Sequence, residues 1–200
     1  MKIALTGGIA CGKSTLAKFL TELGIRVLDA DDVVHALEAP GGEAVEPIRA
    51  RFGSGVIAAD GGVDRKALAG VVFSDPTSRL DLQDLLFPRV RRILLDFAAE
   101  SRPDALRISV IPLLFESHWE ADYDIILAIA SPEAVQIDRM VQTRGYTREQ
   151  AEARLAAQMP VAEKAARADF AVVNDSTPTH LKDEAIRLAS WLKERTHHEH

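Results

Sequence analysis

A glycine-rich segment near the N-terminus has the residue types and spacing of a phosphate-binding loop. Residues 7 to 15 read Gly-Gly-Ile-Ala-Cys-Gly-Lys-Ser-Thr, so Gly7 and Gly12 enclose four residues and Lys-Ser follows at once. Glycines allow the backbone to curl until successive N–H groups point inward and bind phosphate oxygens. In this pattern Lys13 contacts the outer phosphates of a nucleoside triphosphate, and the Ser14 hydroxyl is a ligand of the accompanying Mg²⁺.

The residues that should line this phosphate site are contiguous in the chain. A short apolar run precedes them, and a helical pattern from Ser14 to Leu23 follows them. The positive end of the helix dipole then also attracts the anion. We expect nucleotide contacts from Gly8, Ile9, Ala10, Cys11, Gly12, Lys13, Ser14 and Thr15, with Ser14 as the metal ligand.

Carboxylates follow the second predicted strand, Ile25–Leu28, in the sequence Asp29-Ala30-Asp31-Asp32. Ligands of open α/β sheets gather at the carboxyl ends of strands. A carboxylate placed there orients an acceptor hydroxyl and takes its proton, or holds magnesium through water. Alternatively, Asp31 and Asp32 cap a helix that starts near Val33. The residues alone leave both roles open for Asp31, and the two can coexist.

A basic segment lies between Arg139 and Arg167. It contains six Lys or Arg residues and three Glu residues, a net charge of +3 in a chain whose net charge is −6. Such an excess suits a lid that closes over polyphosphate, because arginines stabilise a transferring phosphoryl group. We favour this function for Arg139 and Arg144, which flank a glycine turn, over a solvated surface.

Two features of the same segment have simpler interpretations. Arg148 and Glu152 have the i, i+4 spacing of an ion pair on a helix surface. Thr147 and Gln150 have the spacing of a capping box, which should start a helix that carries Arg154 and Gln158.

The remaining pattern predicts the elements that position these residues. Five apolar runs indicate strands at Met1–Thr6, Ile25–Leu28, Leu106–Ile111, Tyr123–Ala130 and Phe170–Val173. Ser131-Pro132-Glu133 has the order of a helix start, with serine as the cap. The last helix, roughly Thr179–Glu194, should bury Leu181, Ile186, Leu188 and Trp191. Strands that alternate with helices predict an α/β fold with a parallel sheet covered by helices on both faces.

Composition bounds the class of protein. With 200 residues, 47% of them hydrophobic, the chain can form one compact unit, with a long helical stretch between Val33 and Glu100. A pI near 5.5 argues against nucleic-acid binding through a broadly basic surface. The single cysteine, Cys11, excludes an intrachain disulfide and suits a reducing cytosol. We interpret Cys11 as an incidental small residue, with thiol modification as the minor alternative.

The two ends of the chain suggest no targeting or metal function. Met1 leads straight into a predicted core strand, and no apolar run is long enough to span a bilayer, so we expect neither a signal peptide nor an anchor. The ending Thr196-His197-His198-Glu199-His200 is expected to be a frayed tail rather than a metal site.

Several motifs together resemble those of the dephospho-coenzyme A kinase family, and the resemblance covers nearly the whole chain. Its pieces are Leu5–Ile9 leading into Gly12–Thr15, Asp29–Asp31, Gly62–Leu68 leading to Val72-Phe73, Pro112–Glu116, Arg144–Gln158 and Ala168–Asn174. The phosphate-binding loop alone fits many families, and the combination is far more specific.

This resemblance implies a cytoplasmic enzyme that uses ATP and Mg²⁺ to phosphorylate the ribose 3′-hydroxyl of dephospho-CoA, the last step of coenzyme A biosynthesis. It implies a P-loop kinase core at residues 1–30, 104–138 and 168–195, a helical CoA-binding insertion at 31–103 and a lid at 139–167. Asp31 corresponds to the base for the hydroxyl, Arg139 and Arg144 correspond to the lid arginines, and Asn174 lies where such kinases approach the adenine. The partner is a small-molecule substrate, not a nucleic acid or a membrane.

The sequence departs from the family pattern at two places. Cys11 stands where serine is common, which a cradle of backbone amides should tolerate, and Phe87-Pro88 stands where His-Pro is usual. The alternatives are another small-molecule kinase of the same fold and a GTPase switch. The long helical insertion argues against the first, and the second lacks an Asn-Lys-x-Asp element, since the chain has Val173-Asn174-Asp175-Ser176 there.

Overall fold

The computed structural model describes residues 1–100 and 106–197, with side chains up to residue 195. The chain divides into two compact units, one formed by Met1–Leu28 with Phe97–His200 and the other by Asp29–Asp96. The expected boundary between residues 103 and 104, and the side chains of the histidine-rich end, lie outside the described residues.

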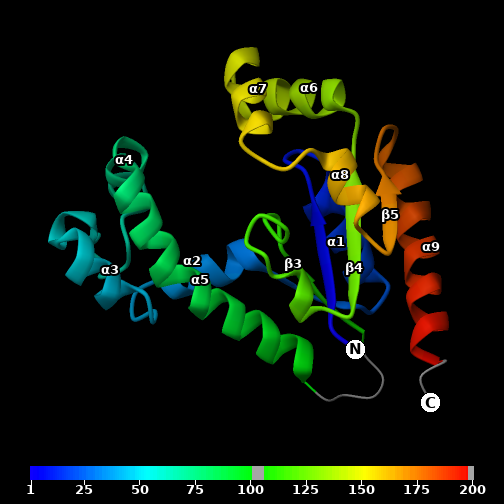
Figure 1. Cartoon of the computed structure of the whole chain (residues 1–200), viewed down its shortest axis with the longest axis horizontal. Coiled ribbons are helices and arrows are strands. Elements are labelled where there is room, and N and C mark those ends of the chain that lie inside the picture. Colours follow the sequence, from blue (N-terminus) through cyan, green and yellow to red (C-terminus); the bar gives the residue numbers. More distant parts are fainter. Residues whose placement is uncertain (101–105, 198–200) are drawn as a thin grey trace. The chain divides into compact units, whose positions relative to one another are not determined.

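The first unit is built on a five-stranded sheet (Figure 1). Its strands are β1 (Ile3–Gly7), β2 (Arg26–Asp29), β3 (Arg107–Val110), β4 (Ile125–Ala130) and β5 (Phe170–Val173), in the order β2-β3-β1-β4-β5. Strand β1 pairs in parallel with β3 and β4, and β4 pairs in parallel with β5. All five strands were predicted, with end points that differ by at most two residues and with no difference at β5.

Strand β1 occupies the centre of the sheet, and all five of its residues are buried. Ile3 lies beside Ile108 of β3 on one side and beside Ile125 of β4 on the other. A strand with neighbours on both sides and helices on both faces needs a continuous apolar run, and Ile-Ala-Leu-Thr-Gly meets that need. The loop that follows Gly7 therefore leaves from the middle of the carboxyl edge, where such sheets bind ligands.

Helices cover both faces of this sheet. Helices α1 (Lys13–Glu22) and α9 (Pro178–His197) pack against each other and against a core that contains Leu5. Helix α8 (Val161–Ala166) packs across β1, β4 and β5. Helix α8 lies on the face opposite to α1 and α9. Neighbouring side chains of a strand point to opposite faces, so Thr6 points away from the face that Leu5 occupies. The Thr6 hydroxyl and Lys164 of α8 both donate to the carbonyl of Pro112, which places α8 on the Thr6 face. Helices α6 (Glu133–Arg144) and α7 (Arg148–Ala156) lie between β4 and α8 in the chain.

Two sequence expectations about this unit are wrong. Ile186 is 45% exposed, because the buried stripe of α9 runs through Leu181, Ala185, Leu188 and Leu192 and leaves Ile186 about 100° away around the helix. Ser131 does not cap α6, whose N-cap residue is Pro132. The Ser131 side chain is buried and donates its hydroxyl hydrogen to the carbonyl of Asn174 at 2.6 Å instead.

The second unit is helical. It contains α2 (Ala30–Glu38), α3 (Val45–Phe52), α4 (Arg65–Ser74) and most of α5 (Pro76–Ala99). The Asp64 side chain starts α4 by accepting hydrogen bonds from two amides of its first turn. The β-pairing within residues 29–96 consists of one isolated bridge between Ile57 and Val63. This agrees with the predicted helical character of the segment. Among the described helices of the chain, none is long and apolar enough to cross a membrane.

Candidate active site

The phosphate-binding loop ends in a helix start that no side chain caps. Gly12 is the N-cap residue of α1 in the left-handed conformation, with φ of 93°, and its carbonyl accepts the first intrahelical hydrogen bond, from Leu16 at 3.0 Å. The amides of Ser14 and Thr15 therefore precede the first intrahelical donor and are available to an anion. A Cβ on Gly12 would lie 2.4 Å from the Nδ2 atom of Asn174, so glycine is required there for space as well as for φ.

Side chains from outside the loop hold its carbonyls in place. Nδ2 of Asn174 donates to the Cys11 carbonyl at 2.9 Å, and Nη1 of Arg139 donates to the Ala10 carbonyl at 3.2 Å. A trans peptide plane directs its carbonyl and its N–H to opposite sides. Holding the Cys11 carbonyl toward Asn174 therefore turns the Gly12 amide toward the interior of the loop.

The same two side chains belong to a buried polar cluster behind the loop. Arg139 also donates to the Ser131 hydroxyl at 3.1 Å and to the Asn174 carbonyl at 3.3 Å. Gln136, which is 2% exposed, donates through Nε2 to the Ser131 carbonyl. The structure thus brings Arg139 and Asn174 together, as two residues that support the loop from behind. Neither Ser131 nor Gln136 was predicted to belong to the site: the Ser131 hydroxyl bonds a carbonyl 43 residues away, and Gln136 joins the cluster through Ser131.

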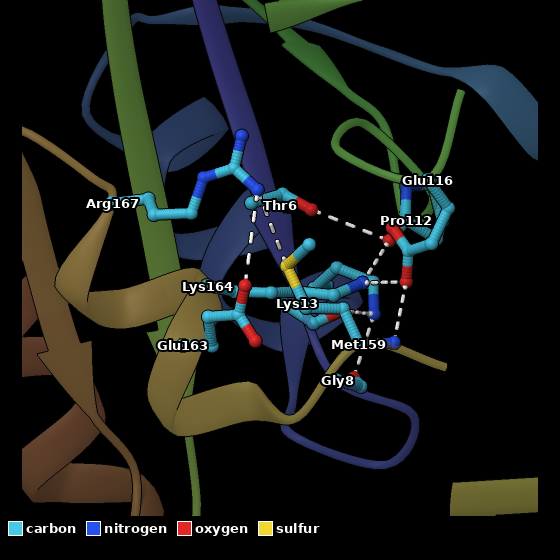
Figure 2. A network of polar contacts seen from close by, with 10 residues as sticks. Thr6, Gly8, Lys13, Pro112, Glu116, Met159, Glu163, Lys164 and Arg167 are labelled. Carbon is cyan, nitrogen blue, oxygen red and sulfur yellow. Dashed lines mark hydrogen bonds and ion pairs between the residues drawn. The ribbon is translucent and has the colours of Figure 1, made fainter. Parts of the chain in front are cut away.

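Lys13 places its ammonium group inside the loop. Its Nζ atom donates to the carbonyls of Gly7 at 2.9 Å and Gly8 at 2.8 Å (Figure 2). The Lys13 ammonium group, which should act on the outer phosphates, therefore already lies at the loop. Phosphate oxygens can replace the two carbonyls as its hydrogen-bond acceptors.

Ser14 is exposed on the first turn of α1, at the start of the helix that follows the loop, so its hydroxyl fits the role of magnesium ligand. Within the described residues no cluster of three or more His, Cys, Asp or Glu side chains forms a separate metal site. A Mg²⁺ ion that accompanies a nucleotide usually keeps several waters and binds phosphate oxygens with few protein ligands, which a single hydroxyl such as that of Ser14 suits.

Cys11 is fully buried in the main core cluster. Burial raises the pKa of its thiol, and this outweighs the attraction of the Lys13 charge. A buried protonated thiol is a poor nucleophile. The geometry favours the interpretation of Cys11 as a small packing residue over thiol modification.

The carboxylates after β2 divide between two roles. Asp29 is the N-cap residue of α2, and its Oδ1 atom accepts the N–H of Asp31 at 2.9 Å. Of the two roles left open for Asp31, the capping alternative does not hold for Asp31 or Asp32, because the helix begins at Ala30, three residues before Val33, and Asp29 caps it. Asp31 and Asp32 lie in the first turn with exposed side chains, and both belong to the second unit.

Helices α6 and α7 carry the other basic residues. Arg144 is the last residue of α6 and is exposed, and Gly145 ends the helix in the left-handed conformation, with φ of 68°. The ion pair between Arg148 and Glu152 is confirmed at 3.0 Å. The capping box of Thr147 and Gln150 is also confirmed, although α7 ends before Gln158.

The phosphate-binding loop also has an apolar contact with these two helices. Ile9 and Ala10 of the loop pack against a small buried cluster formed by Ile137, Met140 and Ala151. Helices α6 and α7 are therefore attached to the loop by packing as well as through Arg139.

A second polar network, which the sequence did not indicate, lies on the face of the sheet covered by α8 (Figure 2). Lys164 of α8 has no exposed surface, and its Nζ atom contacts the Oε1 atom of Glu116 at 2.7 Å and the carbonyl of Pro112 at 2.8 Å. The Thr6 hydroxyl donates to the same carbonyl at 3.3 Å. Glu116 also accepts the amide N–H of Met159 at 3.1 Å. Glu116 belongs to the Pro112–Glu116 motif of the family resemblance, but no sequence pattern indicated that it pairs with Lys164.

Comparison with known proteins gives one consistent result. The profile of the family described as dephospho-CoA kinase matches residues 1–180. A dephospho-CoA kinase from Anaeromyxobacter dehalogenans is 43% identical over 195 residues, which cover 96% of this chain and 92% of the relative. One from Geobacillus kaustophilus is 38% identical over 194 residues, 96% of each chain.

Solved structures agree on the fold. The crystal structure of TT1252 from Thermus thermophilus superposes with a TM-score of 0.78 at 35% identity, covering 95% of this chain and 96% of that one. A shikimate kinase from Acinetobacter baumannii, at 14% identity, reaches a TM-score of 0.52 over 96% of this chain and 93% of its own. The second similarity concerns the fold alone.

Proposed function

The chain belongs to the dephospho-CoA kinase family, and we infer that it transfers the γ-phosphoryl group of ATP to the ribose 3′-hydroxyl of dephospho-CoA, giving coenzyme A and ADP. This reaction is the last step of coenzyme A biosynthesis. The observation that carries the inference is the match over nearly the whole chain, together with a loop whose amides and lysine are arranged for a nucleoside triphosphate.

We propose that the loop acts mainly by positioning and charge. The amides of the Gly8–Thr15 segment bind the phosphates, and Lys13 moves from its two loop carbonyls to the transferring phosphoryl group. Ser14 would hold Mg²⁺, which supplies neutralisation of the charge that develops on the phosphate oxygens. The reaction also requires a binding site for the acceptor, a base for its hydroxyl group and a lid that excludes water.

Asp31 is the proposed general base. Its exposed carboxylate stands two residues beyond the end of β2, and Asp29 already caps the helix, so Asp31 is not needed as a cap. A carboxylate that is free of that structural role can orient the 3′-hydroxyl and accept its proton as the phosphoryl group transfers.

Arg144 and Arg139 have different proposed roles. Arg144, exposed at the end of α6, would reach the phosphates when helices α6 and α7 close. Arg139, together with Asn174, supports the loop through the Ala10 and Cys11 carbonyls. We also propose that Asn174 contributes to the adenine site. The direct action of Arg139 on phosphate stays a prediction.

The remaining assignments are part of the same proposal. Helices of the insertion at residues 31–103 would bind the CoA portion of the substrate, and residues 139–167 would form the lid. We also propose a cytoplasmic location, where the substrate and ATP are available.

An acceptor screen tests the proposed function. ADP release would be measured with ATP and, in turn, dephospho-CoA, shikimate, a nucleoside and no acceptor. We expect release well above background with dephospho-CoA alone. Equal release with shikimate, or release that does not need an acceptor, would contradict the proposal.

A further inference from the structure

We propose that Lys164 and Glu116 are positioning residues for phosphoryl transfer, because they fix the C-terminal end of the α6–α7 segment to the strand that leads into the phosphate-binding loop. This inference rests on the proposed kinase function. It concerns an ion pair between a lysine with no exposed surface and a glutamate whose side chain is 23% exposed, which the mechanism above does not use.

The first part of the argument is the carbonyl of Pro112. This carbonyl accepts hydrogen bonds from the Thr6 hydroxyl and from Nζ of Lys164, so it joins the end of β1, the exit of β3 and helix α8 (Figure 2). Thr6 directly precedes Gly7. The hydrogen bonds between β1 and β3 continue up to these residues, since the amide of Ile111 donates to the carbonyl of Leu5 at 2.8 Å.

The second part is the Glu116 carboxylate. Its Oε1 atom accepts from Lys164 and from the amide of Met159. Met159 lies in the link between α7, which ends at Ala156, and α8, which begins at Val161. The point where the chain returns from α7 to the core is therefore held by a side chain rather than by a strand or a helix.

The third part is what this link carries. Helices α6 and α7 bear Arg144 and pack on Ile9 and Ala10 of the loop. Their N-terminal end is fixed to the core by the Ser131 hydrogen bond to Asn174, and their C-terminal end is fixed by Glu116. Both ends are thus anchored beside the loop, and α8 belongs to the anchor rather than to the moving part of the lid.

Stability alone does not account for this pair. A lysine with no exposed surface loses its hydration, and a buried ion pair often contributes less stability than apolar side chains of similar volume. Within the described residues, the second carboxylate oxygen of Glu116, Oε2, is buried without a hydrogen-bond partner. An unsatisfied buried oxygen costs further stability, so the contacts of this pair are better explained by the three segments that they join.

The test replaces both partners together, since removal of one would leave a buried charge and destabilise the fold. In the Lys164→Met/Glu116→Leu variant we expect thermal stability near that of the parent and an ATP dissociation constant within about threefold of it. We expect kcat with dephospho-CoA to fall by at least about tenfold, because misplacement by 1 Å costs up to about 10²-fold. Arg148→Met is the matched control, because it removes an exposed ion pair from α7 and should keep the parent kcat.

Amide exchange provides a readout that does not depend on activity, and in the parent protein it needs no variant. The Met159 amide should be protected in the parent protein and should exchange faster in any folded variant that lacks the pair. A folded double variant with the parent kcat would overturn the inference, and so would a Met159 amide that exchanges freely in the parent. If the parent does not phosphorylate dephospho-CoA, the proposed function fails, and exchange at Met159 alone decides whether the anchor exists.

Discussion

Replacement of Asp31 by asparagine separates chemistry from structure at one position. The asparagine would keep the size and the polar character of the side chain but could not accept a proton from the 3′-hydroxyl. The structure predicts a small change in stability. Asp31 is exposed, and the cap of α2 is supplied by Asp29, so the loss is limited to one favourable charge at a helix N-terminus, about 0.3–1 kcal/mol.

The expected loss of activity is much larger. Removal of a general base lowers kcat by about 10²- to 10⁴-fold, which corresponds to about 2.7–5.4 kcal/mol in the activation barrier. The assay is ADP release at saturating ATP and dephospho-CoA, together with thermal unfolding followed by circular dichroism. ATP affinity should stay close to that of the parent, since the loop is unchanged.

Asp32→Asn is the matched control. Asp32 lies in the same turn, is also exposed and carries the same charge, so its replacement has the same effect on the helix dipole. We expect nearly full activity in that variant. The reasoning is refuted if folded Asp31→Asn retains most of the parent kcat, or if both variants lose activity equally.

Three further predictions follow from the site and from one buried acid. Lys13→Ala should fold normally and lose about 10²-fold or more in kcat, because it removes a charge that stabilises the transferring group; unchanged turnover would contradict the loop assignment. Arg144→Ala should lower kcat more than it raises the KM for dephospho-CoA, whereas Arg148→Ala should change neither, and equal behaviour of the two would return Arg144 to an ordinary surface residue. Burial raises the pKa of Glu38 above its usual 4.5 despite the nearby Arg65, so the native state binds this proton more tightly than the unfolded state. The stability contribution of Glu38 should therefore fall as pH rises above 4.5, and Glu38→Gln should flatten the pH dependence of the unfolding free energy measured with urea; an unchanged slope would show that Glu38 has no part in it.

Local signals explain why the sheet and the loop could be predicted. The strands are short apolar runs bounded by polar residues, and the loop depends on glycines that are adjacent in the chain. The capping box at Thr147 was correct for the same reason, since both partners lie within one turn. Where hydrogen-bond partners are close in sequence, residue type and spacing carry most of the information.

Long-range contacts explain what could not be predicted. Ser131 has the type and position of a helix cap, but its hydroxyl donates a hydrogen bond to the carbonyl of Asn174, 43 residues away. The Lys164 charge was counted with the surface charges of a lid, whereas its partner carbonyl at Pro112 lies 52 residues away and its side chain is buried. Neither partner can be identified until the β-strands are placed side by side.

Identification of the reaction product tests the central claim most directly. Purified protein would be incubated with ATP, Mg²⁺ and dephospho-CoA, and the products would be separated and examined by mass spectrometry and phosphorus NMR. The account predicts equal amounts of ADP and of coenzyme A that carries a new phosphate on the ribose 3′-oxygen. ADP without a phosphorylated acceptor, or a phosphate at any other position, would contradict it.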